Sequence, residues 1–178
     1  RSYSVTGVQT CALPIFDYSR SLDPDETFGL SLGMIEYLFP TVGFTTTEFY
    51  VGFSADVMLA PNLTVYRDVD QDLIYIHAGV SYDYEVDEKI GVSGSLGLGI
   101  GDKNYCMTYF GVSEDDAATA PMDLNLTVSG SYAISETMSA GVTLTYVTIL
   151  NGDAKDALDA ADREASNFVA GLTFSVSL

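Results

Sequence analysis

The sequence is poor in positive charge, in histidine and in tryptophan. Its 178 residues include seven Lys and Arg against 25 Asp and Glu, a single His and no Trp, for a formal net charge of −18. Such an acidic surface repels phosphate backbones, which excludes nucleic acid as a partner. Disorder is excluded as well, because 47% of the residues are hydrophobic. The chain must therefore bury or embed a large apolar surface.

Long apolar runs are missing too. No segment reaches the roughly 18 consecutive apolar residues that a transmembrane helix needs. In a membrane, every backbone polar group must find a partner within the protein, so spanning segments are either helices or strands of a barrel. A membrane protein of this composition would therefore have to be a β-barrel.

Cysteine is scarce, with only Cys11 and Cys106. Cys11 lies in the run from Val5 to Ile15, which matches the in-frame translation of a common short-read sequencing adapter over eleven consecutive positions. We therefore predict that residues 1–15 are a non-native, adapter-derived segment, and that the native N-terminus with any signal peptide is missing. Cys106 is then alone, which rules out a disulfide framework and favours a structural thiol.

Apolar and small polar residues alternate along most of the chain, which is the pattern of a strand with two different faces. From Ser95 to Ile100, for example, aliphatic residues occupy the even positions, and Gly and Ser occupy the odd ones. The predicted strands are 28–39, 47–59, 62–70, 73–86, 89–101, 121–134, 138–150 and 166–178, with residues 16–20 as the remnant of a ninth.

The polar face of these strands consists of Gly, Ser, Thr and Asn and carries little charge. A soluble sandwich or lipocalin-like barrel would expose Lys, Glu and Arg on its outer face, whereas small uncharged residues suit an enclosed lumen. We predict an all-β fold over residues 16–178: an up-and-down antiparallel transmembrane β-barrel with about eight to ten visible strands, truncated at its N-terminal edge. A soluble barrel is the alternative.

Short and long connections are predicted to alternate between the two ends of the barrel, as in outer-membrane proteins with short periplasmic turns and long outer loops. The tight turns are LAPN (59–62), VDEK (86–89) and ISET (134–137). The longer acidic connections are 68–72, 102–121 and 151–165, with a hairpin or short strand at 104–112 and a short helix at 153–164.

Aromatic residues on the apolar face are expected to form two girdles at the membrane interfaces. One girdle precedes the tight turns and the other lies beside the long loops. The members are Tyr82, Tyr84 and Tyr132 in the first, and Phe49, Tyr146 and Phe168 in the second.

His77, the only histidine, is predicted to lie on the lumen face. A hydrolase would need such a base beside a Ser or an Asp pair near the outer rim. Because His77 has no clear partner, we interpret it as a hydrogen-bonding lumen residue and predict no enzymatic activity and no cofactor. The lumen-facing candidates are Tyr50, Asp56, Tyr66, Asp68, Tyr75, His77 and Asp83.

Asp68, Asp70 and Asp72 have the D-x-D-x-D spacing of a calcium loop. Such a loop needs Gly at its sixth position and a bidentate Glu at its twelfth. Leu73 and Gly79 occupy those positions here, so an ordinary acidic outer loop is the favoured interpretation. Loose binding of a divalent metal near lipopolysaccharide is the alternative.

A pore in such a barrel is expected to prefer cations, because clustered carboxylates at a mouth concentrate cations and exclude anions. The alternative is that these acids only keep the outer loops solvated. The acids are Asp56, Asp68 and Asp83 in the lumen and Asp70, Asp72, Glu114, Asp115, Asp116, Asp153 and Asp156 in the loops, against Arg67, Lys103, Lys155 and Arg163.

Two stretches, TEFYVGFSADVMLAPNLTVYRDVD (47–70) and GLGIGDKNYCMTYFGVSEDDA (97–117), and the alternation at the C-terminal end carry a family resemblance. Over most of residues 28–178 the chain resembles Gram-negative outer-membrane proteins of the TorF-type porin and MltA-interacting (MipA/OmpV-like) families. The resemblance implies a barrel in the bacterial outer membrane, surrounded by lipid and lipopolysaccharide, without settled catalytic residues. It suggests a porin for passive diffusion of small solutes such as cations, or else a scaffold for a cell-wall enzyme.

Overall fold

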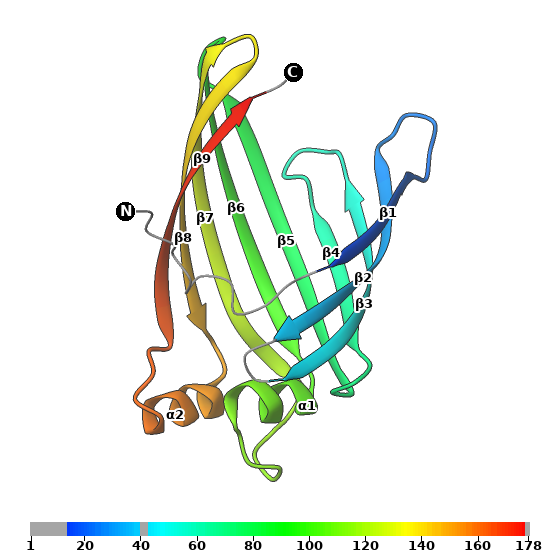
Figure 1. The fold of residues 1–178 in the computed structure, drawn as a ribbon, viewed down its shortest axis with the longest axis vertical. Coiled ribbons are helices and arrows are strands. Elements are labelled where there is room, and N and C mark those ends of the chain that lie inside the picture. The colour runs from blue at the N-terminus through cyan, green and yellow to red at the C-terminus, as the bar shows by residue number, and fades with distance from the viewer. Residues whose placement is uncertain (1–13, 40–42, 177–178) are drawn as a thin grey trace.

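The described residues contain nine strands in one sheet, in which every strand pairs with its neighbours in the sequence (Figure 1). The computed structural model describes residues 14–39 and 43–176. All the pairs are antiparallel, which confirms the predicted all-β, up-and-down fold. The strands are β1 (Ile15–Ser21), β2 (Phe28–Phe39), β3 (Phe44–Ala55), β4 (Asn62–Asp68), β5 (Leu73–Glu85), β6 (Ile90–Gly101), β7 (Ala120–Ser135), β8 (Met138–Ile149) and β9 (Ser166–Val176).

The largest error in the predicted strand bounds is in β3. The strand ends at Ala55, and residues 56–61 form the turn, in which Leu59 and Ala60 have positive φ values of 72° and 29°. The predicted end at residue 59 was wrong, because the apolar alternation runs on into the turn and hides the end of the strand. The segment predicted to come from a sequencing adapter lies outside the described residues except for Pro14 and Ile15, and Ile15 begins β1.

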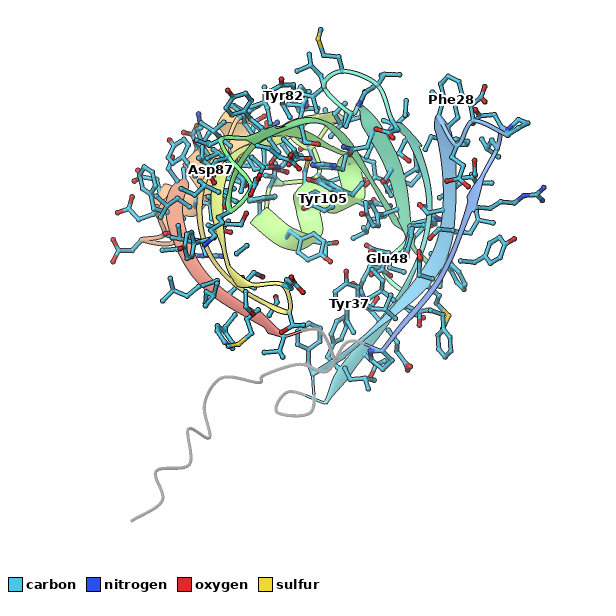
Figure 2. The ribbon with its side chains drawn as sticks, turned by 90° about the horizontal axis from the view of Figure 1, so that it is seen from above. Phe28, Tyr37, Glu48, Tyr82, Asp87 and Tyr105 are labelled. Atoms are coloured by element: carbon cyan, nitrogen blue, oxygen red, sulfur yellow. The ribbon has the colours of Figure 1, made fainter. Side chains whose placement is uncertain are left out.

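The sheet curls around a central space (Figure 2). Phe28 and Tyr82 point away from this space, whereas Tyr37, Glu48 and Tyr105 point into it. Because all nine strands alternate in direction, β1 and β9 run the same way. In the described ranges these two strands are not paired with each other.

The two longest connections, 102–119 and 150–165, lie at one end of the sheet (Figure 1). The predicted long connection at 68–72 was wrong, because residues 69–72 at that same end form a four-residue turn between β4 and β5. Asp68 closes this turn by accepting hydrogen bonds from the amides of Asp70 and Gln71.

The loop after β6 is helical, with α1 (Lys103–Tyr105) followed by a π-helical turn, η1 (Cys106–Phe110). The hairpin or short strand predicted at 104–112 was therefore wrong. Two capping interactions that strand alternation does not reveal explain this: the Asp102 side chain accepts a hydrogen bond from the Tyr105 amide, and Gly111 ends the turn at φ 71°.

The predicted loop helix after β8 is α2 (Gly152–Ala160). The Asn151 side chain starts it by accepting a hydrogen bond from the Ala154 amide over 2.8 Å. In the described part of the chain, no helix is long and apolar enough to span a membrane.

The apolar residues lie mainly on the outside of the sheet. Phe53 is 50% exposed, Leu126 48% and Leu144 58%, although all three lie within strands. Buried apolar side chains cluster instead at the long-loop end. Those in the described residues are Leu73, Cys106, Val112, Ala117, Met122, Ala154 and Leu158.

Candidate functional site

A cavity of about 560 Å³ lies on the concave face of the sheet, toward the long loops. Strands β2 to β5 supply most of its wall, and α1 and η1 cover it. Figure 2 shows Tyr37 and Glu48 pointing into the enclosed space and Tyr105 near its centre. The lining residues are Ile35, Tyr37, Glu48, Tyr66, Tyr75, His77, Tyr105 and Tyr109, and we call this site the tyrosine cavity.

The tyrosine rings form a continuous row across the inner wall. The ring centroids of Tyr50 and Tyr66 are 5.7 Å apart, and those of Tyr66 and Tyr75 are 6.1 Å apart. Tyr75 stacks on Tyr105 at 5.0 Å, and Tyr105 meets Tyr109 at 4.8 Å. These separations are typical of favourable aromatic pairs. The row therefore runs from the strand wall into the loop helix and holds that helix over the cavity.

Three tyrosine hydroxyls on the inner face donate hydrogen bonds to carboxylates. The Tyr37 hydroxyl donates to Glu48 Oε1 over 3.2 Å, and the Tyr75 hydroxyl donates to Asp123 Oδ2 over 2.9 Å. Tyr50 donates in the same way to Asp17 of β1. Hydrogen bonds to a charged acceptor are stronger than neutral ones, so these pairs set the orientation of the rings.

Glycines on neighbouring strands make room for the large side chains. A Cβ atom at Gly33 would overlap the Tyr50 ring, and one at Gly99 would overlap the Tyr75 hydroxyl and the Asp123 carboxylate. At Gly101, it would overlap Tyr105. The tyrosine cavity thus depends on residues without side chains as much as on the tyrosines.

The loop helix is anchored by a small apolar core outside the sheet. Cys106 and Met122 are almost fully buried, and the Cys106 thiol donates to the Ala118 carbonyl over 3.2 Å. Met122 is the residue skipped by a β-bulge, since Gly99 pairs with Asp123 and Ile100 pairs with Pro121. Ala154 from α2 joins the same core, which ties the two long loops together.

Burial changes the acidity of two groups in this loop. It raises the pKa of the Tyr105 phenol above its usual value, and the charge of Asp123 adds to that effect. Burial also raises the pKa of the Cys106 thiol. Both groups therefore remain neutral at physiological pH, which suits a packed helix and agrees with a structural role for Cys106.

The three acids predicted as a loose metal site have separate partners. Asp68 is 1% exposed and accepts hydrogen bonds from the Thr46 hydroxyl and from the amides of Asp70 and Gln71. Asp70 accepts from the Thr47 amide, and Asp72 pairs with Arg67. Within residues 14–39 and 43–176, no three metal-ligating side chains gather at one point. The geometry gives no support to a metal site, and Asp68 closes the turn between β4 and β5.

Of the other lumen-facing candidates, Tyr66, Tyr75 and His77 line the tyrosine cavity. The His77 ring lies over Gly97 beside the Asn125 amide. Tyr50 extends the ring row toward β1.

Asp56 and Asp83 lie elsewhere, in two smaller hollows of about 490 and 460 Å³. Asp83 lines one between β5 and β9 that has hydroxyl-bearing walls, including Ser129 and Thr143. Asp56 follows the end of β3 and lines the other hollow together with Ser54. The sequence-predicted residues are therefore spread over three hollows of the inner face.

Sequence reasoning missed several members of the site. Glu48 shares the parity of Tyr50, and Asp123 shares that of Asn125, so alternation alone could have found both. Tyr37 lies on the polar parity of its strand and could also have been found. Tyr105 and Tyr109 lie in a loop that has no strand period, and no local pattern indicates that they fold back over the lumen.

One comparison places the chain in a family. The family model described as MltA-interacting protein MipA matches residues 15–175, which includes nearly all of the described strands. The chain belongs to the MipA family. This confirms the MltA-interacting half of the resemblance seen in the sequence. No curated relative matches the chain.

Proposed function

We propose that this MipA-family chain is an outer-membrane β-barrel protein and serves as a scaffold that holds a cell-wall enzyme. The partner is inferred from the family match over residues 15–175, because the name of that family identifies MltA as its interaction partner. The proposal includes no catalytic activity of the chain itself.

The distribution of apolar surface supports the membrane location. Large aliphatic and aromatic side chains on the outer face are about half exposed, as for Leu126, Tyr82 and Phe53. A water-soluble protein would not leave so extensive an apolar surface in contact with solvent. A transmembrane barrel requires one, because its outer face contacts lipid.

The covered lumen supports a scaffold over a porin. A wide, open bore would favour diffusion of solutes, but Tyr105 and Tyr109 fold over the inner wall at the long-loop end. The Cys106 core and the helix α2 hold this cover from behind. Such a cover over the inner wall suits anchoring better than transport.

The end with the tight turns is the expected docking surface. In outer-membrane barrels, short turns face the periplasm, where the cell wall lies. The turn after β3 presents an exposed apolar group there: Met58 is 80% exposed, with Val57 and Leu59 beside it. Asp87 and Glu88 in the next turn add negative charge. We expect the partner to present a complementary apolar and basic surface.

Capture of purified MltA by the intact chain in a polyoxyethylene detergent tests the scaffold. A triple variant of the docking turn, Val57→Ser with Met58→Ser and Leu59→Ser, should weaken capture at least about tenfold, since such a group resembles an interface anchor. The matched control is Val69→Ser with Leu150→Ser at the long-loop end, where both residues are also exposed. Failure of the wild-type chain to bind MltA, or equal loss in the control, would overturn the proposal.

A cation-preferring porin is the second candidate, favoured by the charge of the inner wall. The carboxylates of Glu48, Asp83 and Asp123 line or adjoin its hollows, and acidic walls select cations. Conductance in planar bilayers under a salt gradient separates the two functions. A porin should conduct as wild type and select cations, and a scaffold should become conductive only when the cover is removed by Tyr105→Ala.

A further inference from the structure

The tyrosine cavity combines aromatic walls with a negative charge, and its described lining includes no Lys or Arg. Its lining residues are five tyrosines, one isoleucine, one histidine and Glu48. The basic residues nearest in the fold have acidic partners elsewhere, since Arg67 pairs with Asp72 and Lys103 pairs with Glu114. The described part of the cavity therefore has no Lys or Arg to balance its carboxylate.

The Glu48 carboxylate has only one hydrogen-bond partner among the described residues to stabilise its charge. Its side chain is half-buried on β3 and accepts one hydrogen bond, from Tyr37, among the described residues. Asp123 lies one hydrogen bond behind Tyr75 and adds a second negative charge close to the same wall. A carboxylate removed from water gains most from a cation brought directly into its site.

We propose that the tyrosine cavity binds a small organic ammonium ion. The tyrosine ring faces attract a cation through their quadrupoles, which is how aromatic cages recognise quaternary ammonium groups. Glu48 is the counter-ion at the wall, and Tyr66, Tyr75 and Tyr105 form the cage. A volume of about 560 Å³ falls in the range of small-molecule sites. This binding does not depend on the scaffold function.

Two other ligand classes fit these walls less well. Ca²⁺ and Mg²⁺ take six or more oxygen ligands, and the cavity supplies one lining carboxylate among tyrosine rings. Zn²⁺ needs three or four His, Cys or carboxylate ligands, and no such group occurs among the described residues. A neutral sugar could stack on the tyrosines but would leave the charge of Glu48 unbalanced. An organic cation meets both the rings and the carboxylate.

Calorimetric titration of the purified intact chain tests the proposal, in a polyoxyethylene detergent that has neither a choline nor a sugar head group. The probes are choline, its uncharged isostere 3,3-dimethylbutan-1-ol, and maltose. Choline should bind at least about tenfold more tightly than the isostere, because only the charge differs. Equal affinity for the two, tighter binding of maltose, or no binding of choline at millimolar concentration would overturn the proposal.

Variants separate the cage from general stability. Glu48→Gln keeps the shape and the acceptor for Tyr37, and it should weaken choline binding about tenfold. Tyr66→Phe keeps the ring face and should bind nearly as wild type, whereas Tyr66→Ala should lose binding. Tyr82→Ala, on the outer face, is the matched control and should leave the affinity unchanged. A Glu48→Gln chain that unfolds at the wild-type temperature and binds choline normally would also overturn the proposal.

Discussion

The inner face of the sheet has two dissimilar walls. Strands β2 to β5 present tyrosines and an acid, which line the tyrosine cavity of about 560 Å³. Strands β6 to β9 present Gly, Ser and Thr, which line a hollow of about 460 Å³ together with the end of β5. Both walls arise from the same two-residue alternation, with one polar face and one apolar face. Alternation therefore sets which face looks inward, and the side-chain types on that face set the chemistry of each hollow.

The glycines show how the two walls depend on each other. Tyr75 of one wall extends over Gly99 of the other, where a Cβ atom would overlap its hydroxyl. In β9 the situation is different, because the nearest atom to a Cβ at Gly171 is 4.0 Å away. A glycine beside the tyrosine wall is thus required by packing, whereas one in the small-residue wall is not.

The largest expected effect on stability comes from charges placed on the outer face of the sheet, and it should be the same for both walls. Leu32→Arg and Leu126→Arg place a charge on residues that are 44% and 48% exposed, and each should lower the free energy of unfolding by about 2–4 kcal/mol in lipid vesicles. Thr127→Arg, one position away on the inner face, should cost much less. Urea titration of the inserted chain measures all three. Equal losses for Leu126→Arg and Thr127→Arg would contradict a lipid-facing outer surface.

The second prediction tests the packing difference between the two walls. Gly99→Ala should destabilise the folded chain by about 1–3 kcal/mol, because the new methyl group forces Tyr75 or Asp123 to move. Gly171→Ala should change stability by no more than about 0.5 kcal/mol. The comparison is made by urea unfolding in detergent micelles. If both variants behave alike, the glycines do not distinguish the walls.

The third prediction compares hydrogen bonds on the two walls. Tyr75→Phe removes the donor to Asp123 and should cost about 1.5–3 kcal/mol, as for bonds to charged groups. Thr145→Val removes a neutral bond with Thr127, at 2.9 Å, and should cost about 0.5–1.5 kcal/mol. Unfolding free energies of the two variants and of the double variant give the measurement. A larger loss for Thr145→Val would mean that the tyrosine wall is not held by its carboxylates.

The smallest effect concerns Cys106, which anchors the cover of the tyrosine wall. Burial raises the pKa of this thiol in the folded chain, so the folded state retains its proton at a pH where the unfolded thiol loses it. Its contribution to stability is therefore full below the ordinary thiol pKa and declines as the pH rises above it. Maleimide labelling of Cys106 at pH 7, measured on the peptide that contains it so that Cys11 does not contribute, should be slow, since the thiolate is the reactive form.

The matched variant for that test is Cys106→Ala. It should lower the free energy of unfolding at neutral pH through the lost packing. Between pH 8 and pH 10, however, its free energy of unfolding should fall less than that of the wild-type chain. Unfolding curves at both pH values check this. Rapid labelling of Cys106 itself in the folded chain at pH 7 would show that the loop core opens readily.

Much of the fold could be predicted from the residues. The two-residue alternation of apolar and polar residues in β6, β8 and β9 predicted strand positions close to those observed, because each strand has two chemically different faces. The end of β3 could not be predicted, since Val57 and Leu59 continue the period into a turn. The helical segment at Lys103–Phe110 was mistaken for a hairpin, because the caps at Asp102 and Gly111 that define it leave no trace in the strand alternation.

The candidate site, like the fold, could be predicted from the sequence only in part. Parity placed Tyr66, Tyr75 and His77 on one face, and the three do line a common cavity. The closeness of Tyr105 to Tyr75 could not be predicted, because it depends on a bulge at Met122 and on a core shared between two loops.

The sequence by itself determined the all-β class, the inward and outward faces and the positions of the two longest loops. These properties follow from local periods of hydrophobicity, which need no knowledge of distant residues. Only the tertiary structure decided that the acids at 68, 70 and 72 have separate partners and that Tyr105 covers the inner wall. Those outcomes depend on strand register and loop packing, which bring together side chains such as Tyr75 and Asp123 that lie 48 positions apart in the chain.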